Sequence, residues 1–148
     1  MATSEAPGDF PVGLSGDLSP TPDQRAREAH YRNYINHLNE RKLDLSEFVA
    51  DEMVHNNRRF TRKEFEAMLA DDMESFPDLY FNLHMVLVTG DRVASRILFK
   101  ATQVKEWRGK KPDGKTVEFE ELVFYRFEGN KIKEVWSIVG EPKPVSAS

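Results

Sequence analysis

The chain has 148 residues, a formal net charge of −4 and no cysteine. This length suits one domain with a hydrophobic core of its own, and the lack of cysteine excludes disulfides, thiolate metal sites and cysteine nucleophiles. Charges of both signs are mixed, which leaves no basic stripe for nucleic acid and no polybasic patch for a membrane. No apolar run is long enough to span a membrane and residues 1–20 lack the apolar stretch of a signal peptide, so we expect a cytoplasmic protein.

Both ends of the chain are expected to be tails around one continuous domain. Residues 1–20 are rich in Gly, Pro, Ser and Asp, a composition typical of disordered segments. Residues 141–148, "EPKPVSAS", have a similar character and are predicted to be flexible. The domain is therefore predicted to cover residues 21–140.

The first half of the domain carries helix signals. "TPDQ" at 21–24 has the pattern of a capping box and starts a helix. Its apolar face has helical spacing and comprises Tyr31, Tyr34, Ile35 and Leu38. A short second helix is predicted over "DLSEFVADEM" at 44–53. "TRKE" at 61–64 is another capping box, and the third helix that it starts should end before Pro77.

The second half alternates with the period of β-strands. Four strands separated by turn sequences are predicted: Leu79–Val88, Val93–Trp107, Val117–Phe127 and Ile132–Val139. The apolar face of the first strand is expected to comprise Phe81, Leu83, Met85 and Leu87. Helices followed by an antiparallel meander indicate an α+β fold, with the helices packed on one face of a curved sheet.

The third of these strands has a carboxylate in the middle of its apolar face. Glu121 shares its parity with Val117, Phe119, Val123, Tyr125 and Phe127. Burial among apolar groups should raise the pKa of this carboxyl toward neutrality, which suits a general acid or base. Alternatively, "EE" at 120–121 marks a β-bulge, and Glu121 faces solvent together with Glu120.

Four segments resemble the SnoaL-like polyketide cyclase and ester-cyclase family. They are "GDRVASR" at 90–96, "PDGK" at 112–115, "YRF" at 125–127 and "KIKEVW" at 131–136. The resemblance implies a nuclear-transport-factor-two-like cone, in which a curved sheet wraps a deep apolar pocket. It also implies acid–base rearrangement of small molecules without a cofactor, and dimers that form through the outer sheet face.

The resemblance also implies a catalytic histidine and aspartate, at positions that Gln103 and Val123 occupy in this sequence. Glu121 has the inward parity of Val123 and would keep an acid or base in the pocket, about 6–7 Å along the strand. His55 matches a histidine that recurs in the family and is the second catalytic candidate. Alternatively, His55 forms hydrogen bonds with the backbone of a loop.

Five further residues are predicted to bind substrate. Gln103, Trp107 and Tyr125 have inward parity on their strands, and Tyr34 lies on one side of the first helix. Asn56 could orient a substrate oxygen or simply make a turn. No third ligand appears at metal spacing, so no metal site is expected.

The predicted function is that of a cofactor-free isomerase or cyclase of polyketide or terpenoid metabolism. It would act on a hydrophobic small molecule by acid–base catalysis, with a dehydratase, an epoxide hydrolase or a non-catalytic binding module as alternatives. The outward parity of four apolar residues further predicts a homodimer through the outer sheet face: Leu98, Val104, Leu122 and Phe124. Cover by the N-terminal tail is the alternative.

Overall fold

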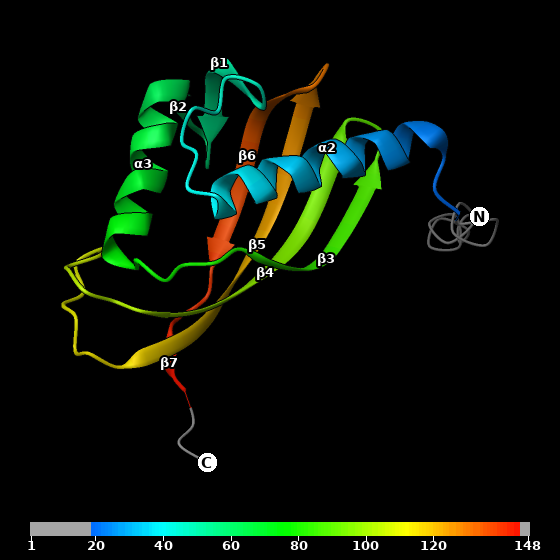
Figure 1. Ribbon diagram of the computed structural model, residues 1–148. Coiled ribbons are helices and arrows are strands. Elements are labelled where there is room, and N and C mark those ends of the chain that lie inside the picture. The colour runs from blue at the N-terminus through cyan, green and yellow to red at the C-terminus, as the bar shows by residue number, and fades with distance from the viewer. Residues whose placement is uncertain (1–18, 146–148) are drawn as a thin grey trace, which may run out of the picture.

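The computed structural model describes residues 19–145 (Figure 1). Its helices are α2 (Pro22–Asn39) and α3 (Arg62–Ser75). Its strands are β1 (Val49–His55), β2 (Arg58–Thr61), β3 (Asn82–Thr89), β4 (Arg92–Thr102), β5 (Thr116–Glu128), β6 (Lys131–Val139) and β7 (Lys143–Pro144). Residues 1–18 of the predicted N-terminal tail lie outside the described residues. Helix α2 begins at Pro22, shortly after the last two residues of this tail.

The strands form one curved, open sheet in the order β2-β1-β6-β5-β4-β3, and β7 pairs with β5. The antiparallel meander from β3 to β6 is confirmed, as is the α+β class. The sheet is mixed rather than purely antiparallel, because β1 runs parallel to β6. Residues 143–144 therefore belong to the sheet, although the sequence predicted a flexible tail there.

Both helices begin at the predicted capping boxes. The Thr21 hydroxyl accepts the amide hydrogen of Gln24 at 3.1 Å, and the Gln24 side chain accepts that of Thr21 at 2.8 Å. Thr61 and Glu64 form the same reciprocal pair, with the same two distances. Such caps satisfy amide hydrogens that the first helical turn leaves without partners. Within the described residues, no helix is long and apolar enough to cross a membrane.

The helix predicted over residues 44–53 is wrong. Residues 46–48 form a turn, and strand β1 begins at Val49. The Leu45 amide donates to the buried Glu66 carboxylate at 2.8 Å, and the Phe48 carbonyl accepts the Ile132 amide hydrogen at 2.7 Å. These tertiary bonds and the pairing with β6 give the segment a partner in the sheet, which outweighs its weak helical pattern.

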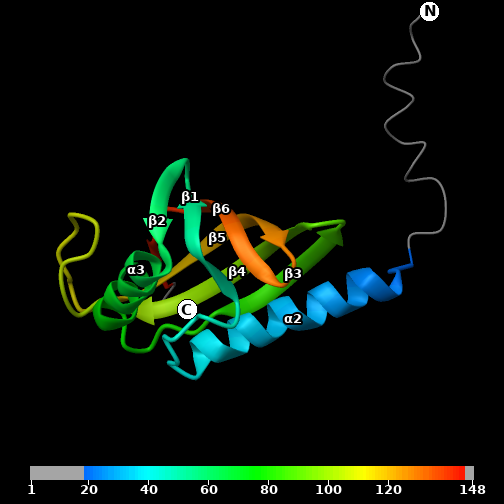
Figure 2. The ribbon, with the colours of Figure 1, turned by 90° about the horizontal axis from the view of Figure 1, so that it is seen from above.

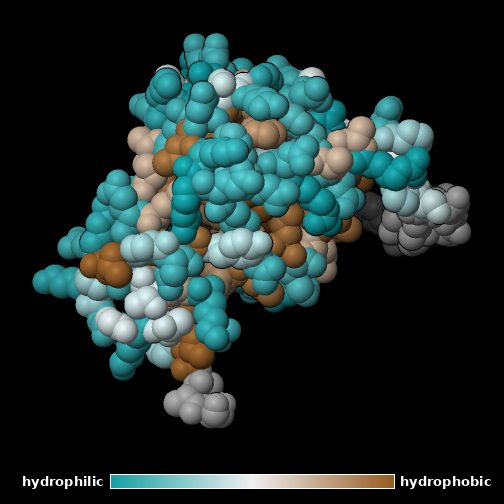
Figure 3. Space-filling model, viewed as in Figure 1, coloured by the Kyte–Doolittle hydropathy of each residue, from teal (hydrophilic) through white to brown (hydrophobic). Residues whose placement is uncertain are grey.

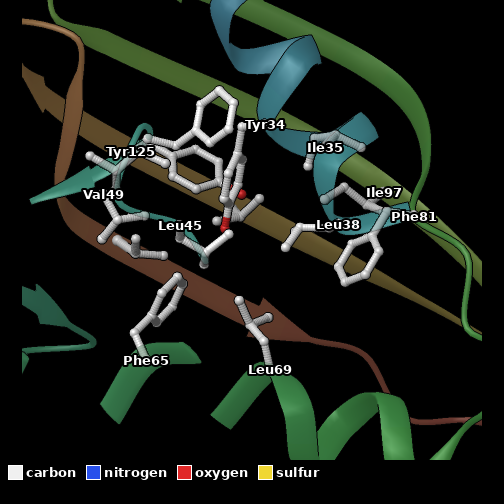
Figure 4. Close-up of a cluster of buried hydrophobic side chains, with 14 of the residues drawn as sticks. Tyr34, Ile35, Leu38, Leu45, Val49, Phe65, Leu69, Phe81, Ile97 and Tyr125 are labelled. Atoms are coloured by element: carbon white, nitrogen blue, oxygen red, sulfur yellow. The ribbon is translucent and has the colours of Figure 1, made fainter. Parts of the chain in front are cut away.

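The core fills the space between the inner sheet face and the two helices. Figure 4 shows side chains from both helices and the sheet meeting there, among them Tyr34 of α2, Leu69 of α3 and Ile97 of β4. Figure 2 shows α2 running beside the sheet along the β3 side. Hydrophilic side chains cover α2 in Figure 3, and apolar atoms appear below it, toward the sheet.

The apolar face predicted for the first strand is wrong in its second half. The β3–β4 register shifts between Leu83 and Met85. Beyond this irregularity the parity is reversed, so that Val86 and Val88 pack on the core, whereas Met85 is 47% and Leu87 61% exposed. One extra residue turns every following side chain to the other face.

Candidate active site

A narrow cavity of about 60 Å³ lies between the two helices and the inner face of the sheet. Most of its wall is apolar and includes Ile35 and Leu38 of α2, Phe65 and Leu69 of α3, and Val123 and Val139 of the sheet. Besides two tyrosines and a tryptophan, five polar side chains interrupt this wall: His55, Asp72, Arg108, Glu121 and Ser137. A mostly apolar cavity with a few convergent polar groups is the usual form of a small-molecule site.

Glu121 lies on the cavity wall, in the middle of β5. The β4–β5 register is continuous through it, with Ile97 directly opposite, so the alternative of a bulge at 120–121 is wrong. The Ser137 hydroxyl donates to a Glu121 carboxylate oxygen at 2.5 Å. Burial raises the pKa of Glu121 and the charge of Asp72 adds to this, whereas Ser137 and Arg108 act against it.

His55 ends β1 and lines the same cavity. Its ring packs against Phe60 and Phe65, with centroids 5.5 and 6.0 Å apart. Neither ring nitrogen forms a hydrogen bond with another described residue. This argues against the alternative that His55 is hydrogen-bonded to the backbone of a loop. Burial lowers the pKa of His55, and the charges of Arg108 and Arg58 lower it further. At neutral pH the imidazole is therefore neutral and able to accept a proton.

Two ionisable residues of the cavity were missed in the sequence. Asp72 of α3 accepts the indole hydrogen of Trp107 at 2.9 Å, and burial raises the pKa of its carboxyl. Arg108 places its guanidinium 4.7 Å from the centre of the Trp107 ring. Asp72 could have been found, because it lies seven residues after Phe65 and hence on the apolar face of its helix. Arg108 lies in a loop, six positions after the last residue of β4. No helix or strand periodicity therefore indicates the direction of its side chain.

Three of the five predicted substrate-binding residues line the cavity: Tyr34, Trp107 and Tyr125. The Tyr125 hydroxyl lies 3.2 Å from that of Tyr31 and is thus engaged. The Tyr34 hydroxyl has no hydrogen-bond partner among the described residues. It is therefore the phenol that is free to serve a ligand.

The other two candidates, Gln103 and Asn56, do not line this cavity, although Asn56 lines an open hollow beside it. Strand β4 ends at Thr102, and the Gln103 amide donates to the carbonyls of Lys105 and Lys110 at 2.8 and 2.7 Å. The prediction that Gln103 lines the cavity is therefore wrong. Asn56 exchanges two hydrogen bonds with the Ser137 backbone, at 3.1 and 2.8 Å, in a turn where its φ is +47°. Its amide thus fixes β1 to β6 and is not free for a substrate.

An open hollow of about 350 Å³ adjoins the cavity. The two spaces share part of their walls: His55, Met68, Asp72, Trp107 and Arg108. The cavity of about 60 Å³ is small beside ligand sites, which usually hold about 300–1,000 Å³. A ligand of two or three rings would have to occupy both spaces or widen the inner one. In the part of the chain that the structure describes, no cluster of three His, Asp or Glu side chains could hold a metal ion.

Comparisons with known proteins agree with this architecture. The family described as SnoaL-like polyketide cyclases matches residues 28–141. A solved structure of a SnoaL-like polyketide cyclase from Agrobacterium tumefaciens strain C58 is 34% identical, covering 78% of this chain and 91% of the other with a TM-score of 0.74.

Two Streptomyces structures share the fold at lower identity. IdmH of Streptomyces antibioticus, a suggested polyketide cyclase, is 22% identical over 76% of this chain and 91% of its own, with a TM-score of 0.67. AclR of Streptomyces galilaeus, a suggested hydroxylase, is 22% identical over 79% and 90%, with a TM-score of 0.68. No curated protein matches the sequence. Because the family match extends over most of the chain and includes the strands that build the cavity, the protein belongs to the SnoaL-like polyketide cyclase family.

Proposed function

We propose that the protein is a cofactor-free isomerase or cyclase that acts by acid–base catalysis on a hydrophobic ketone of natural-product metabolism. The observation that carries this proposal is the position of Glu121. Its carboxyl lies on the wall of an apolar cavity, held by Ser137, with a raised pKa. A carboxylate in such surroundings is a stronger base than one in water.

The proposed reaction begins with proton abstraction next to a carbonyl group. The Glu121 carboxylate takes the proton, and the electrons of the broken C–H bond move into the enolate. Tyr34, whose hydroxyl is uncommitted, donates a hydrogen bond to the developing oxyanion. In an unsaturated ketone the dienolate takes the proton back from Glu121 at the far carbon of the conjugated system, which isomerises the substrate. In a diketone the enolate carbon instead attacks the second carbonyl, and the resulting alkoxide takes the proton from Glu121, which closes a ring. His55 is the second proton-transfer group and lies on the wall shared with the open hollow.

Proton abstraction can be measured without the natural substrate. In D₂O, the protein should accelerate exchange of deuterium into the positions of 2-tetralone next to its carbonyl, as followed by proton NMR. The rate should be unchanged after dialysis against EDTA, because the proposed steps use no metal. A rate equal to that of buffer with free acetate and imidazole would contradict the proposal.

The narrowness of the cavity favours a second candidate function, that of a binding module without chemistry. An enclosed volume of about 60 Å³ is small for a bicyclic substrate. Such a module would bind a hydrophobic ligand at the open hollow and leave the deuterium content of 2-tetralone unchanged. The exchange assay therefore distinguishes the two functions.

The pH dependence of exchange should report the charges around Glu121. The rate should rise with pH through the pKa of Glu121, which is raised above its ordinary value. Asp72→Asn removes a negative charge and should move the midpoint to lower pH, whereas Arg108→Gln removes a positive charge and should move it to higher pH. Shifts in the same direction for both variants would show that another group governs the profile.

We also propose a homodimer through the outer sheet face. Leu122 and Phe124 of β5 are 43% and 59% exposed, and Ile138 beside Leu122 is 71% exposed. Exposed apolar side chains on neighbouring strands form a patch that usually meets a partner. Of the other two residues predicted there, Leu98 is half-buried, and Val104 lies beyond the end of β4. The alternative, in which the N-terminal tail covers this sheet face, involves residues outside the described part of the chain.

Leu122→Asp should disrupt this dimer. A carboxylate in the contact would lose its hydration without gaining a partner, so we expect the dissociation constant to rise by about tenfold or more. Sedimentation equilibrium of the variant and of Lys111→Asp, a charge change in an exposed loop, measures the effect. If the wild-type protein is monomeric at micromolar concentration, the proposed dimer is wrong.

A further inference from the structure

Two arginines face the open hollow without an acidic partner. Arg58 and Arg108 both line it, and neither guanidinium has an ion pair or a hydrogen bond with another described residue. Five other arginines of the described chain do pair with carboxylates: Arg32, Arg62, Arg92, Arg96 and Arg126. The hollow therefore holds two uncommitted cations next to the cavity.

The acidic side chains of the hollow are already engaged. Asp71 accepts a hydrogen bond from the Lys105 ammonium at 3.0 Å. Asp72 accepts the indole hydrogen of Trp107 at 2.9 Å. Neither carboxylate neutralises Arg58 or Arg108 by direct contact, so the charge of the two guanidinium groups faces the hollow.

Both guanidinium groups are held over aromatic rings. Arg58 lies 5.7 Å from the centre of the Phe60 ring, and Arg108 lies 4.7 Å from that of Trp107. Arg108 also has a φ of +51°, a conformation that is costly for a residue with a Cβ atom. Stacking limits the freedom of a long side chain, and strained backbone is concentrated at functional sites. An arginine held in this way loses less entropy when it binds an anion.

We propose that Arg58 and Arg108 bind an oxyanion group, a carboxylate or a phosphate, on a ligand whose apolar part enters the cavity. This inference rests on the proposed function, since it assigns the entrance of the same pocket. A guanidinium group offers two parallel N–H donors, which match the oxygens of carboxylate and phosphate. The anionic end would remain in the wide, open hollow, and the rings would lie along the apolar wall toward Glu121.

His55 provides an independent sign of such binding. The charges of Arg58 and Arg108 lower the pKa of this imidazole, after the larger effect of burial. An anion bound between the two arginines would offset their charge and raise the pKa of His55. The imidazole resonances of His55, followed by NMR as a function of pH, should therefore titrate at higher pH when the anion is present.

The test compares three ligands with the same ring system: 2-naphthoate, 2-naphthyl phosphate and the neutral 2-naphthamide. By isothermal titration calorimetry, the full-length protein should bind an anion about tenfold or more tightly than the amide. The double variant Arg58→Gln/Arg108→Gln should lose this preference, so that it binds the anions no more tightly than the amide. Arg59→Gln is the matched control, because Arg59 follows Arg58 on β2 but lines a different hollow. It should keep the preference.

Each outcome decides for or against the inference. A preference for only one of the two anions would identify carboxylate or phosphate as the natural group. Equal affinity for the amide and both anions, an equal loss in Arg59→Gln, or no binding of any of the three would overturn it. If deuterium exchange is absent while the preference persists, the proposed function fails and the anion site stands.

Discussion

Glu121→Gln should slow deuterium exchange into 2-tetralone by about 10²–10⁴, the usual contribution of a positioned general base. Glutamine keeps the size of the side chain and can still accept the hydrogen bond of Ser137, but it cannot take a proton. Proton NMR of the ketone in D₂O at about pH 7 measures both rates.

Glu120→Gln is the matched control for this experiment. Glu120 lies next to Glu121 in β5, but its carboxylate pairs with Arg96 at 2.6 Å and both side chains are more than a third exposed. The control removes the same charge from the same strand outside the cavity, so it should keep the wild-type rate. An unchanged rate in Glu121→Gln would remove Glu121 from the mechanism, and an equal loss in both variants would indicate a general electrostatic effect.

The loss of activity should not be accompanied by a loss of stability. Because the pKa of Glu121 is raised in the folded protein, its ionisation opposes folding more strongly as pH rises from the unfolded value toward the folded one. A neutral glutamine is free of this penalty. We therefore expect chemical denaturation to show Glu121→Gln as stable as the wild type or more stable near neutral pH. This result would separate a catalytic role from a structural one.

The sequence predicted the parts of the site that depend on strand parity. Glu121 breaks the apolar face of a long strand whose register has no irregularity beside it, so alternation alone placed its side chain inward. The capping boxes at Thr21 and Thr61 likewise fixed the start of both helices, since such signals act within a few residues. These features are local, and no tertiary contact overrides them.

The alternation of side chains predicts which face a residue lies on only within a regular strand. It fails beyond a register shift and beyond the end of a strand. The predicted inward position of Gln103 assumed that β4 continues, but the strand stops at Thr102, where the Asp78 carboxylate accepts the backbone amide hydrogen at 3.0 Å. The register shift after Leu83 moved Met85 and Leu87 outward for the same reason. Arg108 and Arg58 reach the site through loop and hairpin geometry, which leaves no periodic trace in the sequence.

A second carboxyl beside Glu121 should make folding strongly dependent on pH. Val123 is 1% exposed, lines the cavity, and lies two residues from Glu121 on the same face of β5. In Val123→Asp, burial and the neighbouring carboxyl would both raise the pKa of the introduced group. Val123→Asn is the matched control, since it introduces similar size and polarity without a charge.

The free energy of unfolding of the two variants should diverge as pH rises. Below the unfolded pKa of about 3.9 both side chains are neutral, so the difference is small. As pH rises toward the raised folded pKa, the unfolded chain releases its proton more readily and the aspartate variant loses stability. A folded pKa near 6 would make the difference between the variants about 2 kcal/mol larger at about pH 8 than at about pH 4.5. Urea denaturation at both pH values measures it. A difference that does not grow with pH would mean that the introduced carboxyl is solvated, and that the space around Glu121 is too wet to raise the pKa of a catalytic base.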